Sequence, residues 1–183
     1  MFAIDDAMAD VVAQSTQPAL GAIKLAWWRE RLEELDQGKV PAEPRLESAA
    51  EELLPRGISG AGLATLEDGW ATLLDEAPDP ERIARRGSML FGLAAKLLGS
   101  EATEEITAAG RVFATADVAR RGLTVEFPKA DLAGIIVDRP LRCLTAMSAL
   151  AARDILRDSF EAEATPGRAW TLLRHRLTGT FPH

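Results

Sequence analysis

Residues 18–35 read PALGAIKLAWWRERLEEL and carry the clearest structural signal in the chain. This spacing of apolar residues places them on one face of an α-helix. A proline, favoured in the first helical turn, opens the stretch, and Gly38 follows its end. The segment predicts an amphipathic helix. Its apolar residues recur at intervals of three or four: Leu25, Trp28, Leu32 and Leu35.

The same helical spacing extends over most of the remaining sequence. Two predicted helix starts carry capping signals, Ser59 and the run Asp79-Pro80-Glu81, in which an N-cap precedes a proline and an acid. The prolines fall mostly between the periodic segments. We predict a single all-α domain over residues 1–183. The further helical segments carry their periodic apolar residues over 2–14, 46–54, 63–74, 83–97, 102–116, 141–155 and 170–177, and the helix that begins near Ala102 is expected to end at Gly122.

One stretch, residues 123–137 (LTVEFPKADLAGIIV), has a composition typical of strands. Pro128 interrupts it, and the short apolar run at 135–137 has no second strand with which to pair. We therefore expect no sheet.

Composition excludes several classes of protein. The chain has 183 residues, 47% hydrophobic and 27% charged, which suits one domain with a sizeable core. A net charge of −7 argues against a nucleic-acid partner, because phosphate binding needs concentrated Lys and Arg. One cysteine forbids an intrachain disulfide, and one cysteine with two histidines cannot form a His/Cys zinc cluster.

Membrane and export signals are missing from the sequence. No stretch approaches the ~20 apolar residues that span a bilayer. The first ten residues, MFAIDDAMAD, carry acids where an export signal needs basic residues. We expect a cytoplasmic protein without a transmembrane segment.

Carboxylates supply the candidate chemistry, since the sequence lacks phosphate-binding loops and the metalloprotease and hydrolase motifs. Asp5, Asp6 and Asp10 lie close together, and the last two share one helical face. Two such carboxylates can hold Mg²⁺ with substrate phosphate oxygens, although spacing alone favours a solvated acidic face. Asp117 lies on an apolar helix, where an internal salt link or an i, i+3 pair with Arg120 is the expected arrangement.

The aromatic residues favour a structural interpretation. Adjacent residues on a helix point about 100° apart, so Trp27 and Trp28 cannot form one stacking platform. We expect Trp28, Trp70 and Trp170 in the core, with Trp27 against a neighbouring helix. Cys143 is expected to be a small buried apolar residue.

The C-terminal segment carries a basic group, in contrast to the acidic character of the whole chain. Such a group can contact an anionic surface, but we favour a solvated terminal helix. Its members are Arg168, Arg174, His175 and Arg176.

Five segments, taken in order, resemble the squalene/phytoene synthase family, and most closely its divergent branch similar to mitochondrial complex I assembly factors with a synthase-like domain. The most specific are GxIxLxWWRxxL (Gly21 to Leu32) and LAAxLLG (Leu93 to Gly99), and the resemblance runs from about Phe2 to Leu177. It implies an isoprenoid synthase fold, with helices around a central apolar cavity. The five segments are 18–35, 63–74, 87–99, 108–122 and FPKADL at 127–132.

In active members of that family, two aspartate-rich motifs face each other across the cavity and bind Mg²⁺ ions that hold a prenyl diphosphate. Residues 2–4 resemble the start of the first motif. In that alignment Ala9 and Asp10 stand at the positions of the motif's paired aspartates. Only Asp10 matches there, Ala13 is a further departure, and Asp6 stands where the family has an arginine.

The second motif departs further from the family pattern. Gly110 and Arg120 match it, and Asp117 stands at an asparagine. Arg121 occupies the first metal-binding aspartate and Val125 a following acidic position. A positive charge there opposes Mg²⁺, so we expect no bound metal cluster.

The resemblance leaves three functional hypotheses. The favoured one is a non-catalytic protein that keeps the cavity for an isoprenoid, another lipid or a partner protein. The alternative is a Mg²⁺-dependent prenyl transferase acting on prenyl diphosphates, and the third is a fragment that needs a partner chain. The candidate diphosphate- or substrate-binding residues are Asp6, Asp10, Asp117, Arg120 and Arg121.

The first segment also predicts an interaction surface. The chain begins within the family's first motif helix, so an upstream helix is expected to be missing. Little later sequence is spare to cover Phe2, Ile4, Met8 and Val12. Since large apolar patches are rarely left open, we expect a homodimer or a partner protein at this end.

Overall fold

The computed structural model describes residues 1–123, 132–157 and 160–182, and this part of the chain is all-helical, as predicted. It contains no strand beyond an isolated antiparallel bridge between Ile136 and Thr180. Single-turn 3-10 helices occur at η1 (Leu54–Arg56), η2 (Thr72–Leu74) and η3 (Arg139–Leu141). The α-helices are α1 (Phe2–Gln14), α2 (Pro18–Leu35), α3 (Pro44–Glu52), α4 (Gly60–Ala64), α5 (Leu66–Ala71), α6 (Pro80–Leu97), α7 (Glu104–Arg120), α8 (Arg142–Arg157) and α9 (Pro166–Thr178).

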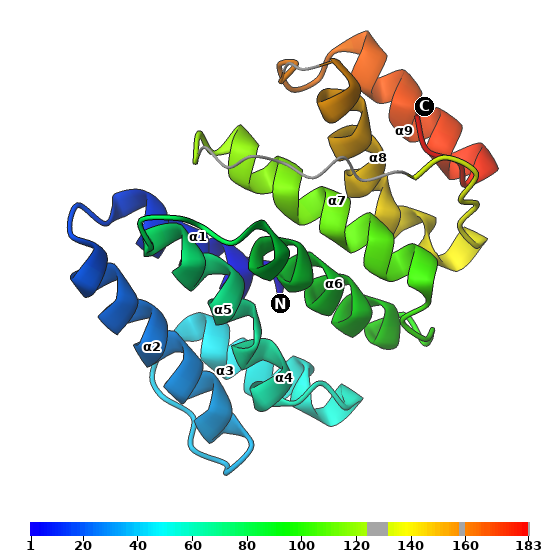
Figure 1. The fold of residues 1–183 in the computed structure, drawn as a ribbon. Coiled ribbons are helices and arrows are strands. Elements are labelled where there is room, and N and C mark those ends of the chain that lie inside the picture. The colour runs from blue at the N-terminus through cyan, green and yellow to red at the C-terminus, as the bar shows by residue number, and fades with distance from the viewer. Residues whose placement is uncertain (124–131, 158–159, 183) are drawn as a thin grey trace.

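Helices α6 and α7 pack side by side at the centre of the molecule (Figure 1). Gly87 of α6 and Gly110 of α7 meet at their crossing, where a Cβ on either residue would overlap the backbone of the other helix. Only glycine permits so close a contact. Helix α8 packs on α7, and α9 packs on α8, so that α9 lies on the opposite side of the molecule from α2 (Figure 1).

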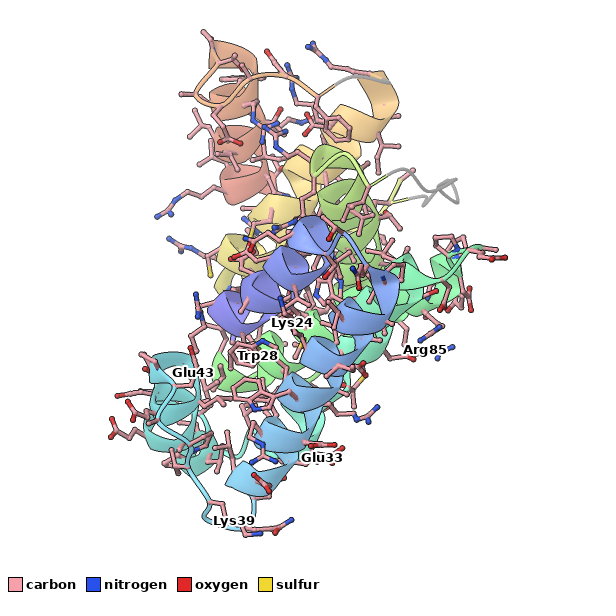
Figure 2. All side chains as sticks on the ribbon, turned by 90° about the vertical axis from the view of Figure 1, so that its left-hand side faces the viewer. Lys24, Trp28, Glu33, Lys39, Glu43 and Arg85 are labelled. Atoms are coloured by element: carbon pink, nitrogen blue, oxygen red, sulfur yellow. The ribbon has the colours of Figure 1, made fainter. Side chains whose placement is uncertain are left out.

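Helix α2 forms an outer wall, as Figure 2 shows from that side. Lys24 and Glu33 are exposed along it, whereas Trp28 is buried against the core. The rings of Trp27 and Trp28 lie at 82° to each other, so they form no common platform, as expected. The prediction that Trp28 and Trp70 belong to the core is confirmed.

The predicted capping signals operate as expected. The Ser59 hydroxyl accepts a hydrogen bond from the Gly62 amide, and the Asp79 carboxylate accepts one from the Glu81 amide. The helix predicted over 63–74 is instead divided into α4, α5 and η2. At the first break the Thr65 hydroxyl donates to the Gly62 carbonyl, a local bond that competes with regular helix geometry.

The expectation that the apolar side of α1 remains uncovered is wrong. Ile4, Met8 and Val12 are buried within their own chain. Phe2 packs edge-on against Phe91 and Phe113, with ring centres 6.5 Å and 6.4 Å away. Helices α2, α3 and α5 cover α1, so the physical basis for self-association at this end is removed.

Three expectations for the C-terminal part are also wrong. Trp170 is 66% exposed rather than part of the core, and Cys143 is exposed rather than buried. Arg168 and His175, expected on a solvated helix, are buried against α8. For Trp170, Arg168 and His175 the cause is shared: α9 presents its polar side to the protein and its apolar side to solvent.

Candidate functional site

The three aspartates of α1 lie in different environments. Asp5 is only 3% exposed, and it shares the buried side of the helix with Met8. Asp6 and Asp10 are exposed on the other side, as their spacing predicted. The sequence therefore located the acidic face correctly, but the acid that enters the interior is Asp5.

The side chain of Arg86, on α6, lies in the interior between α1 and α7. Its Nη1 donates to both oxygens of Asp5, at 3.2 Å and 3.0 Å, and its Nη2 donates to Asp117 at 3.0 Å. The Ala114 carbonyl also accepts from Nη2, at 3.3 Å. The side chain is fully buried. A single guanidinium thus joins carboxylates from two helices that are far apart in sequence.

Trp70, on α5, completes the surroundings of this guanidinium. The Arg86 guanidinium carbon lies 3.7 Å from the centre of the Trp70 ring, which is the geometry of a cation–π contact. The indole Nε1 of Trp70 donates to Asp5 at 2.7 Å. Arginine, aspartate and tryptophan therefore bind one another in a buried site, in which the Arg86 Nε alone of the guanidinium nitrogens has no hydrogen-bond partner.

Arg121 extends the network to the surface. Its Nη2 donates to Asp6 at 2.7 Å, and its Nε donates to Asp117 at 2.9 Å. An internal salt link of Asp117, one of the two expected arrangements, is confirmed. The alternative, an i, i+3 pair with Arg120, does not form, because Arg86 and Arg121 bind this carboxylate instead. Hereafter, the five residues Asp5, Asp6, Arg86, Asp117 and Arg121 are called the aspartate–arginine network.

Electrostatics favours a closed network over an ion-binding site. Burial raises the pKa of the Asp5 carboxyl, and the neighbouring Arg86 opposes that rise. Mg²⁺ prefers carboxylate oxygens with open coordination positions. Here guanidinium groups already engage the carboxylates that face each other, so the residues present do not fit a metal cluster.

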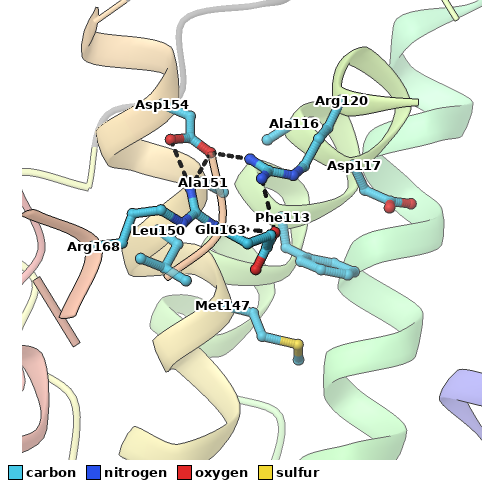
Figure 3. A pocket seen from close by; sticks show the side chains of 10 residues that line it. All are labelled: Phe113, Ala116, Asp117, Arg120, Met147, Leu150, Ala151, Asp154, Glu163 and Arg168. Atoms are coloured by element: carbon cyan, nitrogen blue, oxygen red, sulfur yellow. Dashed lines mark hydrogen bonds and ion pairs between the residues drawn. The ribbon is translucent and has the colours of Figure 1, made fainter. Parts of the chain in front are cut away.

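A second cluster of charges lies between α7 and α8 (Figure 3). Arg120 turns away from Asp117 and donates to Asp154 at 3.0 Å and to Glu163 at 2.8 Å. Asp154 also accepts from Arg168, at 3.0 Å and 2.9 Å, so this carboxylate lies between two arginines (Figure 3).

This second cluster lies at a pocket with a mostly apolar lining. The volume is about 240 Å³, and Phe113 and Met147 contribute apolar surface from the two facing helices (Figure 3). The remaining apolar residues are Ala116, Leu150 and Ala151.

A larger apolar pocket of about 400 Å³ adjoins it. Met147 lines both pockets, and Phe2, whose ring packs on Phe113, lines the larger one. This volume lies within the ~300–1,000 Å³ range usual for small-molecule sites. The other lining residues come from the chain start, α6, α8 and the end of α3: Met1, Leu53, Ala94, Leu97, Leu98, Cys143 and Leu144.

The predicted site residues are thus brought together only in part. Asp6, Asp117 and Arg121 meet, whereas Arg120 belongs to the second cluster. Asp10 is exposed, with no ion-pair partner among the residues that the structure describes. Val125 and residues 127–131 of the FPKADL segment lie outside the described residues.

Sequence reasoning missed Asp5 and Arg86 as site residues. Their positions carried a signal, because each interrupts an apolar stripe. Asp5 precedes Met8 by three residues, and Arg86 lies between Ile83 and Leu90 at helical spacing. A charged residue on the buried side of a helix needs a partner of opposite charge, and these two are partners.

Comparison of the chain with models of protein families, with curated proteins and with solved structures gave no match.

Proposed function

We propose that this protein is a non-catalytic binding protein built like a squalene/phytoene synthase, whose apolar pockets take an isoprenoid or another lipid chain. The position of Arg86 is the observation that carries the proposal. Its guanidinium lies between Asp5 and Asp117, acids from two helices that face each other.

The chemistry of prenyl transfer supports the non-catalytic part of this proposal. Ionisation of a prenyl diphosphate requires metal ions that neutralise the departing diphosphate. A buried guanidinium already paired with two carboxylates has no free charge to offer in their place. Arg121 likewise already forms ion pairs with Asp6 and Asp117.

The two adjoining pockets support the binding part. Their walls are mostly aliphatic and aromatic, and Met147 between them has a flexible side chain that adapts to irregular shapes. Charged groups gather at one end, around Arg120 and Asp154. An elongated apolar ligand with a polar head matches this distribution.

A first experiment tests for catalysis. The protein is incubated with farnesyl diphosphate and Mg²⁺, and released pyrophosphate is measured. We expect none above the level of a protein-free control. Release that disappears in an Asp117→Asn variant would overturn the proposal and establish the transferase alternative.

A second experiment tests for ligand binding. Displacement of a fluorescent fatty-acid probe by farnesol is measured for the parent protein and for Met147→Trp, which fills the space where the pockets meet. We expect at least tenfold weaker probe binding in this variant. Met89→Trp, which adds the same ring at a partly exposed position of α6 outside both pockets, is the control. Absence of probe binding to the parent protein, or equal binding to all three proteins, would contradict the proposal.

A further inference from the structure

Helix α9 has its polar side inside and its apolar side outside. Arg168, Thr171 and His175 are buried, at spacings of three and four residues that define one face. On the opposite side Trp170, Leu173 and Leu177 are 66%, 47% and 69% exposed. An amphipathic helix ordinarily packs the other way round, so this orientation requires an explanation.

Specific polar contacts fix this orientation. Arg168 forms a buried ion pair with Asp154, at 2.9 Å. The His175 Nε2 and the Thr145 hydroxyl share a hydrogen bond of 2.8 Å, and the His175 Nδ1 lies 2.9 Å from the Thr180 carbonyl oxygen. Rotation of α9 to bury its leucines would break all of these bonds. The apolar face is therefore held outward by the fold.

Several arginines beside this face have no ionic partner. Most arginines of this acidic chain pair with carboxylates. Within the described part of the chain five form no ion pair: Arg85 on α6, and Arg139, Arg142, Arg174 and Arg176 in or near α8 and α9. Arg174 and Arg176 flank the exposed apolar residues of α9 on its two sides. Unpaired cations thus border the apolar surface.

A cavity of about 560 Å³ lies between η3, α8 and α9 at this place, and three of these arginines line it. Arg142 caps α9 by donating to the carbonyls of Arg176 and Leu177, at 3.1 Å and 2.8 Å. The guanidinium groups of Arg139 and Arg176 stay available. Leu172 and Leu177 supply apolar walls, so the cavity offers both cationic and apolar groups to one ligand.

We propose that the outer face of α9 binds the surface of an anionic phospholipid bilayer. The apolar residues enter the boundary between headgroups and acyl chains, where Trp is favoured, while the arginines contact lipid phosphates. None of the described helices is long and apolar enough to cross a membrane. Helix α9, with 13 residues, lies in the plane of the interface instead.

Charge distinguishes this occupant from a second copy of the chain. A two-fold dimer would place the same surface against itself and bring the unpaired arginines of both copies together. Like charges in contact disfavour association. An anionic lipid surface satisfies the apolar residues and the arginines at once. This inference is independent of the proposed ligand pockets, to which α9 contributes only Arg168, on its buried side.

Vesicle co-sedimentation tests the proposal. Vesicles of pure phosphatidylcholine are compared with vesicles of equal parts phosphatidylcholine and phosphatidylserine. We expect binding to the anionic vesicles that weakens as salt is added, because surface charges are screened. Arg174→Gln/Arg176→Gln is expected to bind roughly 10–30-fold more weakly, and Leu173→Ser/Leu177→Ser at least tenfold more weakly.

A matched variant controls for the loss of apolar surface in general. Leu20→Ser/Ile23→Ser removes two exposed apolar side chains from α2, on the opposite side of the molecule, and should bind as the parent does. Circular dichroism checks that every variant is folded. Absence of binding to anionic vesicles, or equal binding by all variants, would overturn the proposal. So would a dimer, detected by light scattering, that the Leu173→Ser/Leu177→Ser variant dissociates.

Discussion

The first and last helices of this protein are attached to it in opposite ways. Helix α1 buries apolar residues and exposes Asp6 and Asp10. Helix α9 buries an arginine, a threonine and a histidine, and it exposes a tryptophan and three leucines. Each helix also contributes one buried aspartate–arginine pair, Asp5 with Arg86 for α1 and Arg168 with Asp154 for α9.

The comparison shows that amphipathic spacing identifies two faces of a helix without telling which is inside. For α1 the apolar face finds partners on three other helices. For α9, which packs mainly on α8, the polar contacts of α8 determine the buried side. The following predictions test whether α1 is held to the protein by apolar packing and α9 by polar contacts. They are given from the largest expected effect to the smallest.

Loss of the ion pair at α1 should be the most damaging change. In Arg86→Met, the Asp5 carboxylate remains buried without its charged partner, which costs about 3–5 kcal/mol of unfolding free energy. Arg168→Met at α9 should cost less, about 1–3 kcal/mol, because Arg120 still contacts Asp154 at 3.0 Å. Urea unfolding at neutral pH measures both.

The pH dependence of the Arg86→Met variant provides a second measurement. Burial already raises the pKa of Asp5, and removal of the guanidinium raises it further. A carboxyl whose pKa is higher in the folded state favours folding at low pH and loses that contribution as the pH rises. The stability deficit of Arg86→Met should therefore shrink in acid. Arg85→Met, an exposed neighbour, is the control, and a deficit that is independent of pH would contradict the assignment of the charge to Asp5.

Apolar truncation should distinguish the two helices. Met8→Ala in α1 opens a cavity at a fully buried position and should cost about 2–5 kcal/mol. Leu173→Ala in α9 removes an exposed side chain and should change stability by less than ~0.5 kcal/mol. Thermal unfolding of the two variants gives the comparison, and equal losses would mean that α9 is packed through its apolar face after all.

Acid should weaken the attachment of α9 specifically. Burial lowers the pKa of His175, although its contact with the Thr180 carbonyl opposes this. A histidine with a lower pKa in the folded state binds more protons when unfolded, so folding loses stability as the pH falls through about 6.5. Amide exchange in α9 should therefore accelerate below that pH while exchange in α1 is unchanged. A His175→Gln variant should lose this dependence, and a uniform acceleration across both helices would point to another group.

Much of the fold was predictable because it depends on local chemistry. Apolar spacing, prolines and the caps at Ser59 and Asp79 act within a few residues, so the sequence indicates the helices and most of their starts. The orientation of α9 was not predictable in this way. It depends on partners on α8, such as Thr145 and Asp154, whose proximity only the folded chain establishes.

For the aspartate–arginine network, the sequence predicted some of the individual residues but not the contacts between them. The sequence identified Asp6, Asp117 and Arg121 separately, and for Asp117 it left open an internal salt link or a pair with Arg120 on the same helix. The arginine that engages Asp117 in the interior is 31 positions away in the chain. It reaches the acid because Gly87 and Gly110 let α6 and α7 approach closely.

The position of Arg86 also constrains how this sequence can change over generations. Replacement of Arg86 leaves the acids Asp5 and Asp117 facing each other without the guanidinium between them. Replacement of Asp5 alone removes the acceptor of both hydrogen bonds that the Arg86 Nη1 donates. Either first step lowers stability, and only a coordinated second substitution can recover it. The effect of each substitution in the network thus depends on which residues occupy the other positions. Selection for folding alone is then sufficient to retain these residues.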